Sequence, residues 1–431
     1  MKMSRLMVSA VLCATLAAGA LFAEGKGEKK AADRPISWWA LSGGGGADDI
    51  RETFRRQIIA DYEAANPGVK IDLVMLDNES FKQKVQVAIQ AGNPPDIFHS
   101  WGGGVMVDYA NAGMLRDITE MVKSDLSKTV GIGALGVYGH DGKYYGSPYD
   151  MGSVGIWYNK KIFKDLGIEV PKTFDELLTI VPVIKKAGIT PIALGAGDRW
   201  PAHYWWVYLA MRLGGKDAFD KAYDGRGSFK DAPFVEAGKL LAKLRDLEPF
   251  QAGFIGATYD DQAALMGNGK AAMELMGQWA PATEASNSVS GEGIGDDLGW
   301  ASFPAVAGGK GALTDVMGGG NGYVIGKDAS DQALDFFKFF MQRKYNEELV
   351  KVEGIIPVVK GAEAAIAGNA NQVAIVEAIA KAQYYQLYYD QFLPVSVGEA
   401  VKDAVASLLA AQSTPEECAA AIDASWQKER K

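Results

Sequence analysis

Tryptophan residues stand in the sequence where short apolar segments end. Trp101 follows the apolar segment that ends at Phe98 and precedes three glycines, and Trp279 follows a second such segment at 271–276. Ligands of open α/β sheets bind at strand ends, so both side chains are candidates for a site, with the protein core as the alternative. A flat indole covers a weakly apolar ring face, while nearby carboxylates, amides and guanidinium groups bond hydroxyls. This combination predicts a ligand that is a small ring bearing many hydroxyls.

The polar groups of such a site are expected from several separate segments. Arg199 and Trp200 open an aromatic stretch whose later rings are expected to pack inside. Asn78 and Glu79 follow a predicted strand, so they either contact ligand or cap the next helix. Asp150 follows a Pro-Tyr step and is expected to accept hydrogen bonds from ligand hydroxyls. The full set of candidate ligand-binding residues is Ser42, Asn78, Glu79, Trp101, Asp150, Arg199, Trp200, Trp279, Gly319, Gly320, Asn321 and Asp390.

Two glycine runs, at 43–46 and 318–320, are interpreted as places where backbone approaches the ligand, with plain turns as the alternative. A dinucleotide loop is not indicated, because Asp48 and Asp49 stand where glycine or alanine is needed and would repel phosphate. No Gly-Lys-Ser/Thr run supports ATP binding.

The sequence gives little support to catalysis or to a metal site. The three histidines, His99, His140 and His203, have no paired spacing, and a Gly-x-Ser-x-Gly elbow is absent. No motif places two carboxylates across one glycosidic bond, although a pair could still assemble in space. We therefore expect no enzymatic activity, no metal and no cofactor, and a secreted glycosidase is kept as an alternative.

The beginning of the chain predicts export. Lys2 and Arg5 precede a mainly apolar stretch, which is typical of a signal peptide over residues 1–23, with cleavage after Ala20 or Ala23. The polar residues that follow, 24–32, are expected to be a flexible tether.

Loss of Lys2 and Arg5 with the signal would change the net charge from −9 to −11. Such a charge disfavours nucleic acid and anionic membranes as partners. Cys13 would also be lost, which leaves Cys418 alone and excludes an intrachain disulfide. Lipidation at Cys13 is left open, although Leu12 replaces the small residue expected before it.

Hydrophobic periodicity predicts strands and helices in alternation, which is typical of an α/β protein with a largely parallel sheet. A turn at 140–143 predicts a hairpin, and Thr173 with Glu176 forms a capping box for a helix. The predicted strands lie near 35–41, 69–75, 96–98, 154–158 and 189–194, and the predicted helices near 50–62, 81–89, 162–166 and 174–184.

Several segments, in their joint order, resemble the extracellular solute-binding proteins of sugar ABC importers. The resemblance covers residues 36 to 420 and is carried by no single motif. The segments that carry it are 93–98 with Trp101 (NPPDIF), 146–150 (GSPYD), 157–160 (WYNK), 171–177 (PKTFDEL), 269–273 (GKAAM), 277–280 (GQWA), 318–325 (GGGNGYVI) and 354–358 (GIIPV).

This resemblance implies the two-lobed periplasmic-binding-protein fold of type II, with a ligand cleft between the lobes and a hinge of crossing strands. The lobes are expected at 33–125 with 299–344, and at 126–298 with 345–431. It also implies capture of a mono- or oligosaccharide for delivery to the transmembrane subunits of an ABC permease, with no cofactor.

The resemblance further implies a monomer in the periplasm or at the cell surface. The alternatives are the glycosidase named above, a chemoreceptor ligand, and the same fold binding a metal chelate, a polyamine or a peptide.

Overall fold

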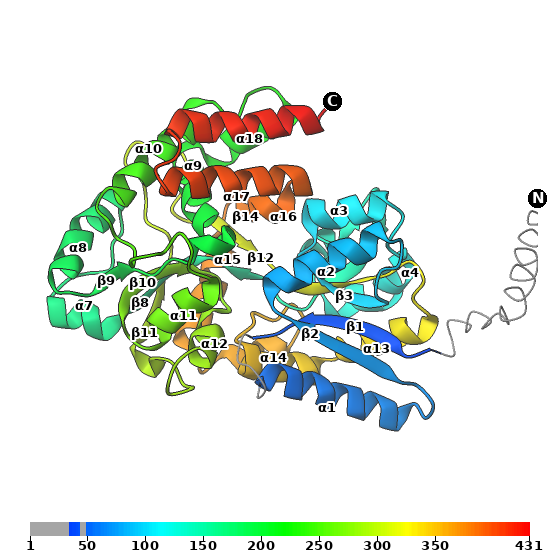
Figure 1. Cartoon of the computed structure of the whole chain (residues 1–431). Helices are drawn as coiled ribbons and strands as arrows, with labels where there is room; N and C mark the ends of the chain where they lie inside the picture. The colour runs from blue at the N-terminus through cyan, green and yellow to red at the C-terminus, as the bar shows by residue number, and fades with distance from the viewer. Residues whose placement is uncertain (1–33, 44–48) are drawn as a thin grey trace, which may run out of the picture.

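The structure is a computed structural model that describes residues 34–43 and 49–431, and it forms two lobes side by side (Figure 1). The predicted signal peptide and tether, and the glycines at 44–46, lie outside the described residues.

The first lobe is built on a five-stranded sheet with the order β2-β1-β3-β13-β6. Trp38 of β1 is 1% exposed and meets the rings of Tyr323, Phe336 and Phe340 edge-on at 5.2–5.6 Å between centroids. These contacts pack the helix that carries Phe336 and Phe340 against the sheet through large buried aromatic surfaces. Its strands are β1 (Ile36–Leu41), β2 (Ile71–Leu76), β3 (Ile97–Ser100), β6 (Gly146–Pro148) and β13 (Gly322–Ile325), with a hairpin of β4 (Gly139–His140) and β5 (Lys143–Tyr144) beside it.

Side-chain caps begin the two helices that reach the space between the lobes. Asp49 accepts a hydrogen bond from the Arg51 N–H at the start of α1, and Asp77 accepts one from the Ser80 N–H at the start of α2. The first-lobe helices are α1 (Ile50–Ala65), α2 (Asn78–Gln90), α3 (Gly103–Asn111), α4 (Thr119–Met121), α5 (Ser127–Thr129), α6 (Ile132–Gly136), α13 (Asp331–Phe340) and α14 (Arg343–Glu353).

The second lobe has a four-stranded sheet with the order β11-β8-β10-β9. Its long helix α9 carries Trp205 and Trp206, both fully buried, as expected for the later rings of the aromatic stretch. The strands are β8 (Gly155–Asn159), β9 (Thr190–Ile192), β10 (Ala271–Met276) and β11 (Leu298–Ala301). The helices are α7 (Lys160–Leu166), α8 (Phe174–Lys186), α9 (Trp200–Asp224), α10 (Ala232–Arg245), α11 (Tyr259–Gly267), α12 (Ala280–Ser286), α15 (Ala370–Lys381), α16 (Tyr389–Phe392), α17 (Val395–Leu409) and α18 (Pro415–Glu429).

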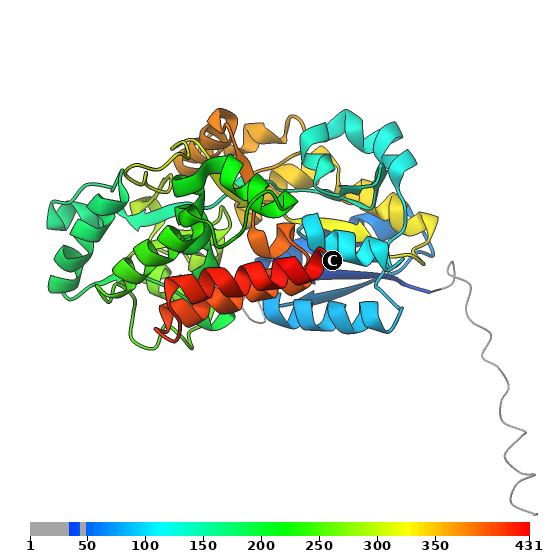
Figure 2. The ribbon, with the colours of Figure 1, turned by 90° about the horizontal axis from the view of Figure 1, so that it is seen from above.

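Three crossing segments connect the lobes in a small sheet of β7 (Gly152–Ser153), β12 (Val316–Gly319) and β14 (Tyr385–Leu387), in the order β14-β12-β7. A Cβ on Gly318 would collide with the backbone oxygen of Gly152, so only glycine allows this pairing. The view from above shows α17 and α18 running beside α9 and toward α3 of the first lobe (Figure 2).

The predicted hairpin at 140–143 and the Thr173 capping box are confirmed, and each strand and helix predicted from periodicity has a counterpart. The sheets are not largely parallel, however. In the first sheet β13 is antiparallel to both β3 and β6, and in the second β8 is antiparallel to β10 and β11. Periodicity alone carries no information about strand direction, because the pattern is the same for both.

The expected division into lobes also differs from the packing. Residues 126–148 belong with the first sheet, because β6 pairs with β13 and Leu135 lies in the first core. Tyr345 of α14 bonds Asp61 of α1 at 2.9 Å, so residues 345–366 join that lobe too, whereas β11 pairs with β8 of the second. We therefore propose a revised division, with 34–148 and 322–366 in the first lobe, and 154–315 and 370–431 in the second.

Candidate functional site

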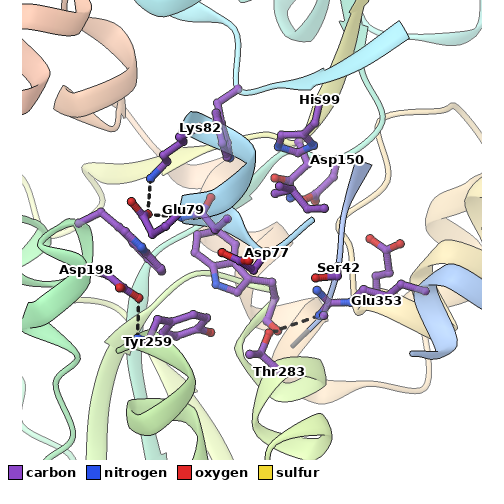
Figure 3. A pocket seen from close by; sticks show the side chains of 18 of the residues that line it. Ser42, Asp77, Glu79, Lys82, His99, Asp150, Asp198, Tyr259, Thr283 and Glu353 are labelled. Carbon is purple, nitrogen blue, oxygen red and sulfur yellow. Dashed lines mark hydrogen bonds and ion pairs between the residues drawn. The ribbon is translucent and has the colours of Figure 1, made fainter. Parts of the chain in front are cut away.

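A cavity of about 440 Å³ opens between the two lobes, and both lobes and the crossing segments line it. Figure 3 shows labelled side chains that converge from strand ends and helices of the first lobe, and from Asp198, Tyr259 and Thr283 of the second. This volume is in the range of sites for small organic ligands.

The first-lobe wall presents Trp101 directly after β3, half-buried and held edge-on by Phe81 and His99, at 6.0 and 4.6 Å between centroids. The ammonium of Lys82 lies 5.6 Å from the Trp101 ring centroid and binds the carboxylate of Glu79 at 2.9 Å (Figure 3). One side of the cavity therefore offers an aromatic surface bordered by an ion pair.

Two charged side chains of this wall form an ion pair with each other. Arg55 of α1 is 1% exposed and binds the carboxylate of Glu353 at 2.5 Å. Its neighbour Arg51 reaches across to the second lobe, where its guanidinium donates to the Thr283 hydroxyl at 3.3 Å. Among the bonds described, this one joins the lobes across the cavity mouth.

The second-lobe wall is aromatic. Trp200 and Trp279 lie 6.3 Å apart between centroids, Tyr259 lies 4.9 Å from Trp200, and Tyr388 lies 6.2 Å from Trp279. Their mutual angles are steep rather than stacked, so several ring faces and edges border the cavity. Such rings can cover both the faces and the rim of a ligand ring.

Asp150 lies where the crossing segments meet, fully buried at the cavity floor. One carboxylate oxygen accepts from the amides of Gln278 and Asn321 at 2.6 and 2.8 Å, and the other accepts from the Ile356 N–H at 2.9 Å. Burial raises the pKa of Asp150 to about 7 against the effect of these donors. Asp150 thus ties Gln278 of the second lobe, Ile356 of the first lobe and the segment after β12 together at the hinge, and its expected role as acceptor for ligand stays a prediction.

Nine of the candidate ligand-binding residues line this cavity together. Asn78 and Glu79 do not cap α2, because the capping residue is Asp77. Both stand in the first turn of α2 and line the cavity. The nine are Ser42, Asn78, Glu79, Trp101, Asp150, Trp200, Trp279, Asn321 and Asp390.

Three candidates lie elsewhere. The Arg199 guanidinium binds Asp403 and Glu399 of α17, at 2.5 and 3.1 Å, and does not line the cavity. Gly319 and Gly320 lie at the hinge, where an added Cβ would strike the ring of Tyr388 and the backbone of residue 150. The lack of a side chain at these two glycines therefore lets other segments of the protein come close, and not a ligand as predicted.

Sequence reasoning missed several lining residues, among them Arg51, Arg55, Lys82, Asp198 and Tyr259. Only Tyr259 could have been found from a sequence motif, since Thr258 and Asp261 form a capping box that marks the start of its helix. The others stand on helices or loops without a distinguishing pattern, and only the lobe arrangement brings them together.

Over residues 34–43 and 49–431, no helix combines the length and apolar character needed to span a bilayer. The same described part of the chain holds no group of three or more His, Cys, Asp or Glu side chains arranged for a metal ion.

A cavity between two lobes, joined by three crossing segments, defines a two-lobed ligand-binding protein. The profile of the bacterial extracellular solute-binding protein family matches residues 47–347. The chain belongs to this family. Because it is a family of binding proteins, the membership confirms the expected non-enzymatic function and decides against the glycosidase.

Relatives and solved structures agree with this assignment. The chain is 26% identical to the diacetylchitobiose-binding protein of Streptomyces coelicolor over 80% of this chain and 79% of that one. It is 30% identical to an ABC transporter extracellular-binding protein of Pyrococcus horikoshii, over 56% of this chain but only 54% of the relative.

A chitin oligosaccharide binding protein has a TM-score of 0.83 at 26% identity, covering 92% of this chain and 98% of that one. A structure from work on xylan utilisation by Caldanaerobius polysaccharolyticus has a TM-score of 0.82 at 28% identity, covering 91% and 99%. The fold is therefore the expected two-lobed one.

Proposed function

We propose that this protein captures a mono- or oligosaccharide between its lobes and delivers it to the transmembrane subunits of an ABC permease. The observation that carries the proposal is the cavity itself, with Trp101 on one wall and Trp200 and Trp279 on the other. Similarity to a diacetylchitobiose-binding protein and to a chitin oligosaccharide binding protein supports it.

Binding would proceed by closure of the lobes over the ligand. A saccharide ring lies against Trp101, and Trp279 and Trp200 approach from the second lobe, while amides and carboxylates bond its hydroxyls. A ligand closes the lobes only by binding the closed arrangement more tightly than the open one. The bond from Arg51 to Thr283 is a candidate closure contact, since it crosses between the lobes.

The experiment is a thermal-shift screen against mono- and oligosaccharides, followed by calorimetry on every sugar that shifts the midpoint. A ligand that binds only the folded state adds about 2.7 kcal/mol of stability at 100 times its dissociation constant. Trp101→Ala and Trp279→Ala should each abolish most of the shift. Trp39→Ala is the matched control, because Trp39 also lies under a lysine, Lys84 at 5.1 Å, but is outside the cavity.

A shift with one family of sugars, lost in the two cavity variants and kept in the control, supports the function and the site. Shifts with peptides, metal chelates or polyamines and with no sugar would overturn the saccharide assignment. We also propose a monomeric protein outside the cytoplasmic membrane, which sedimentation of the mature chain and fractionation of cells would test. Nucleic acid is not expected to bind, given the acidic net charge of −9.

A further inference from the structure

Charges are divided unequally between the two walls of the cavity. The three cationic side chains that line it, Arg51, Arg55 and Lys82, all come from α1 and α2 of the first lobe. Among the described lining residues, the second lobe contributes carboxylates but no lysine or arginine. A ligand in the cavity therefore meets a second-lobe wall whose charge is entirely negative.

Two of these carboxylates, Asp198 and Asp260, have no ion-pair partner within the described part of the chain. Asp198 accepts one hydrogen bond, from the Tyr259 N–H at 2.8 Å, and Asp260 accepts a long one from Asn287 at 3.5 Å. Arg199, adjacent to Asp198 in sequence, is held on α17 instead. Burial of these two carboxyl groups beside other acids raises the pKa of both.

The third carboxylate, Asp390, is 7% exposed and faces a fully buried histidine. The His203 Nδ1 lies 2.6 Å from the Trp200 carbonyl oxygen and therefore carries the proton, while Nε2 lies 3.4 Å from the Asp390 carboxylate without a hydrogen-bond alignment. Burial alone would raise the pKa of Asp390, but nearby positive charges, among them those of Lys402 and Lys82, keep this pKa below its usual value. Asp390 thus stays an anion, with one oxygen lacking a donor.

A neutral side chain on the same wall also lacks a donor. The Oε1 atom of Gln391, a residue 7% exposed, is buried and accepts no hydrogen bond within the described chain, whereas Oε1 of Gln278 is packed against Gly152 of β7. Both residues line the cavity. A carbonyl oxygen can only accept, so the Gln391 oxygen together with Asp390 favours a ligand that donates hydrogen bonds. This observation is independent of the carboxylate charges.

The aromatic rings strengthen the same preference. Trp200, Trp279, Tyr259 and Tyr388 surround this part of the cavity with centroids 4.9–6.3 Å apart. An ammonium near such rings is attracted by the negative faces of the ring quadrupoles. An ammonium also donates three hydrogen bonds and accepts none.

We propose that the second-lobe wall recognises a protonated amine, so that the preferred ligand is an amino sugar. This inference rests on the proposed function and names its ligand class. The amine lies on the side of the cavity that carries Asp198, Asp260 and Asp390, and the remaining hydroxyls meet Trp101 and the first-lobe wall. The positive charge of Lys82 acts on Asp198 and Asp390 from a distance, but its ammonium forms its ion pair with Glu79 and with neither of these acids. Uronic acids are disfavoured by the same three carboxylates.

The test compares sugars that differ in one substituent. Calorimetry measures binding of glucose, glucosamine and glucuronate, of the galacto series, and of cellobiose beside its diamino counterpart from chitosan. At pH 6 and low salt, the amino sugar of at least one series should bind about tenfold or more tightly than its neutral partner, a difference of about 1.4 kcal/mol. The uronate should bind most weakly. The preference should shrink with added salt and above the pKa of the amine.

Matched variants locate the effect. Asp198→Asn and Asp260→Asn keep the shape and a hydrogen-bond acceptor, so each should lower the amino-to-neutral affinity ratio severalfold while neutral sugars still bind. Asp72→Asn, an exposed acid at the far end of β2, is the control and should leave the ratio unchanged.

Neutral sugars that bind as tightly as their amino partners in every series would overturn the inference and leave the proposed function standing. A uronate that binds best would do the same. Failure of every sugar to bind would overturn the proposed function itself.

Discussion

Two buried carboxyl groups behind the second-lobe wall should make the stability of this protein fall as pH rises. Glu274 of β10 is fully buried and Glu284 of α12 is 1% exposed, and they lie within hydrogen-bond reach of each other. Gln262 donates to one oxygen of Glu274 at 2.9 Å. The other Glu274 oxygen and both Glu284 oxygens have no donor within the described chain, and neither residue has an ion-pair partner there. A proton held between the two carboxyl groups satisfies them.

The sign and the size follow from burial. Burial raises the pKa of Glu274 to about 7, and burial together with the charge of Glu274 raises the pKa of Glu284 well above its usual value. The folded protein then holds a proton that the unfolded chain releases above about pH 4.3. Each bound proton lowers the free energy of unfolding by about 1.4 kcal/mol per pH unit above that point, and the loss reaches about 3 kcal/mol near pH 7.

The assay is urea unfolding of the wild type and of Glu284→Gln between pH 5 and 9. The amide introduced by this substitution donates to Glu274 without any shared proton. The variant should therefore lose at least about 1 kcal/mol less stability across this range than the wild type. Glu292→Gln, in an exposed loop of the same lobe, should follow the wild type. Parallel loss in wild type and Glu284→Gln would refute the shared proton.

Three other perturbations follow from single contacts. Arg55→Met leaves a buried carboxylate unpaired and should lower the free energy of unfolding by about 3–5 kcal/mol in urea unfolding, and a smaller change would mean that water reaches the pair. Gly318→Ala should lower the free energy of unfolding by about 1–3 kcal/mol in thermal unfolding. Gly131→Ala, with open space around the glycine, should change it little, and equal effects of the two variants would contradict the packing argument. Arg51→Gln removes the bond to Thr283, so stopped-flow release of bound sugar should be about fivefold faster, and an unchanged rate would show that the bond does not hold the lobes closed.

Local sequence patterns predicted the elements well because their causes are local. Alternation marked β2, four-residue spacing marked α1, and Thr173 with Glu176 marked the start of α8. Assignment to lobes depends on pairing between distant residues, such as Gly146 of β6 with Val324 of β13. No local pattern encodes that register, so residues 126–148 could not be placed from the sequence.

The candidate site shows the same limit at the scale of three consecutive residues. Asp198 and Trp200 line the cavity, while Arg199 between them has a φ of 64° and pairs with acids of α17. The backbone at this step sends the carboxylate inward and the guanidinium outward. Sequence reasoning chose the arginine and passed over the aspartate, so it placed a positive charge where the cavity has a negative one. Because that charge decides between amino sugars and uronic acids, the ligand class depends on the conformation of Arg199.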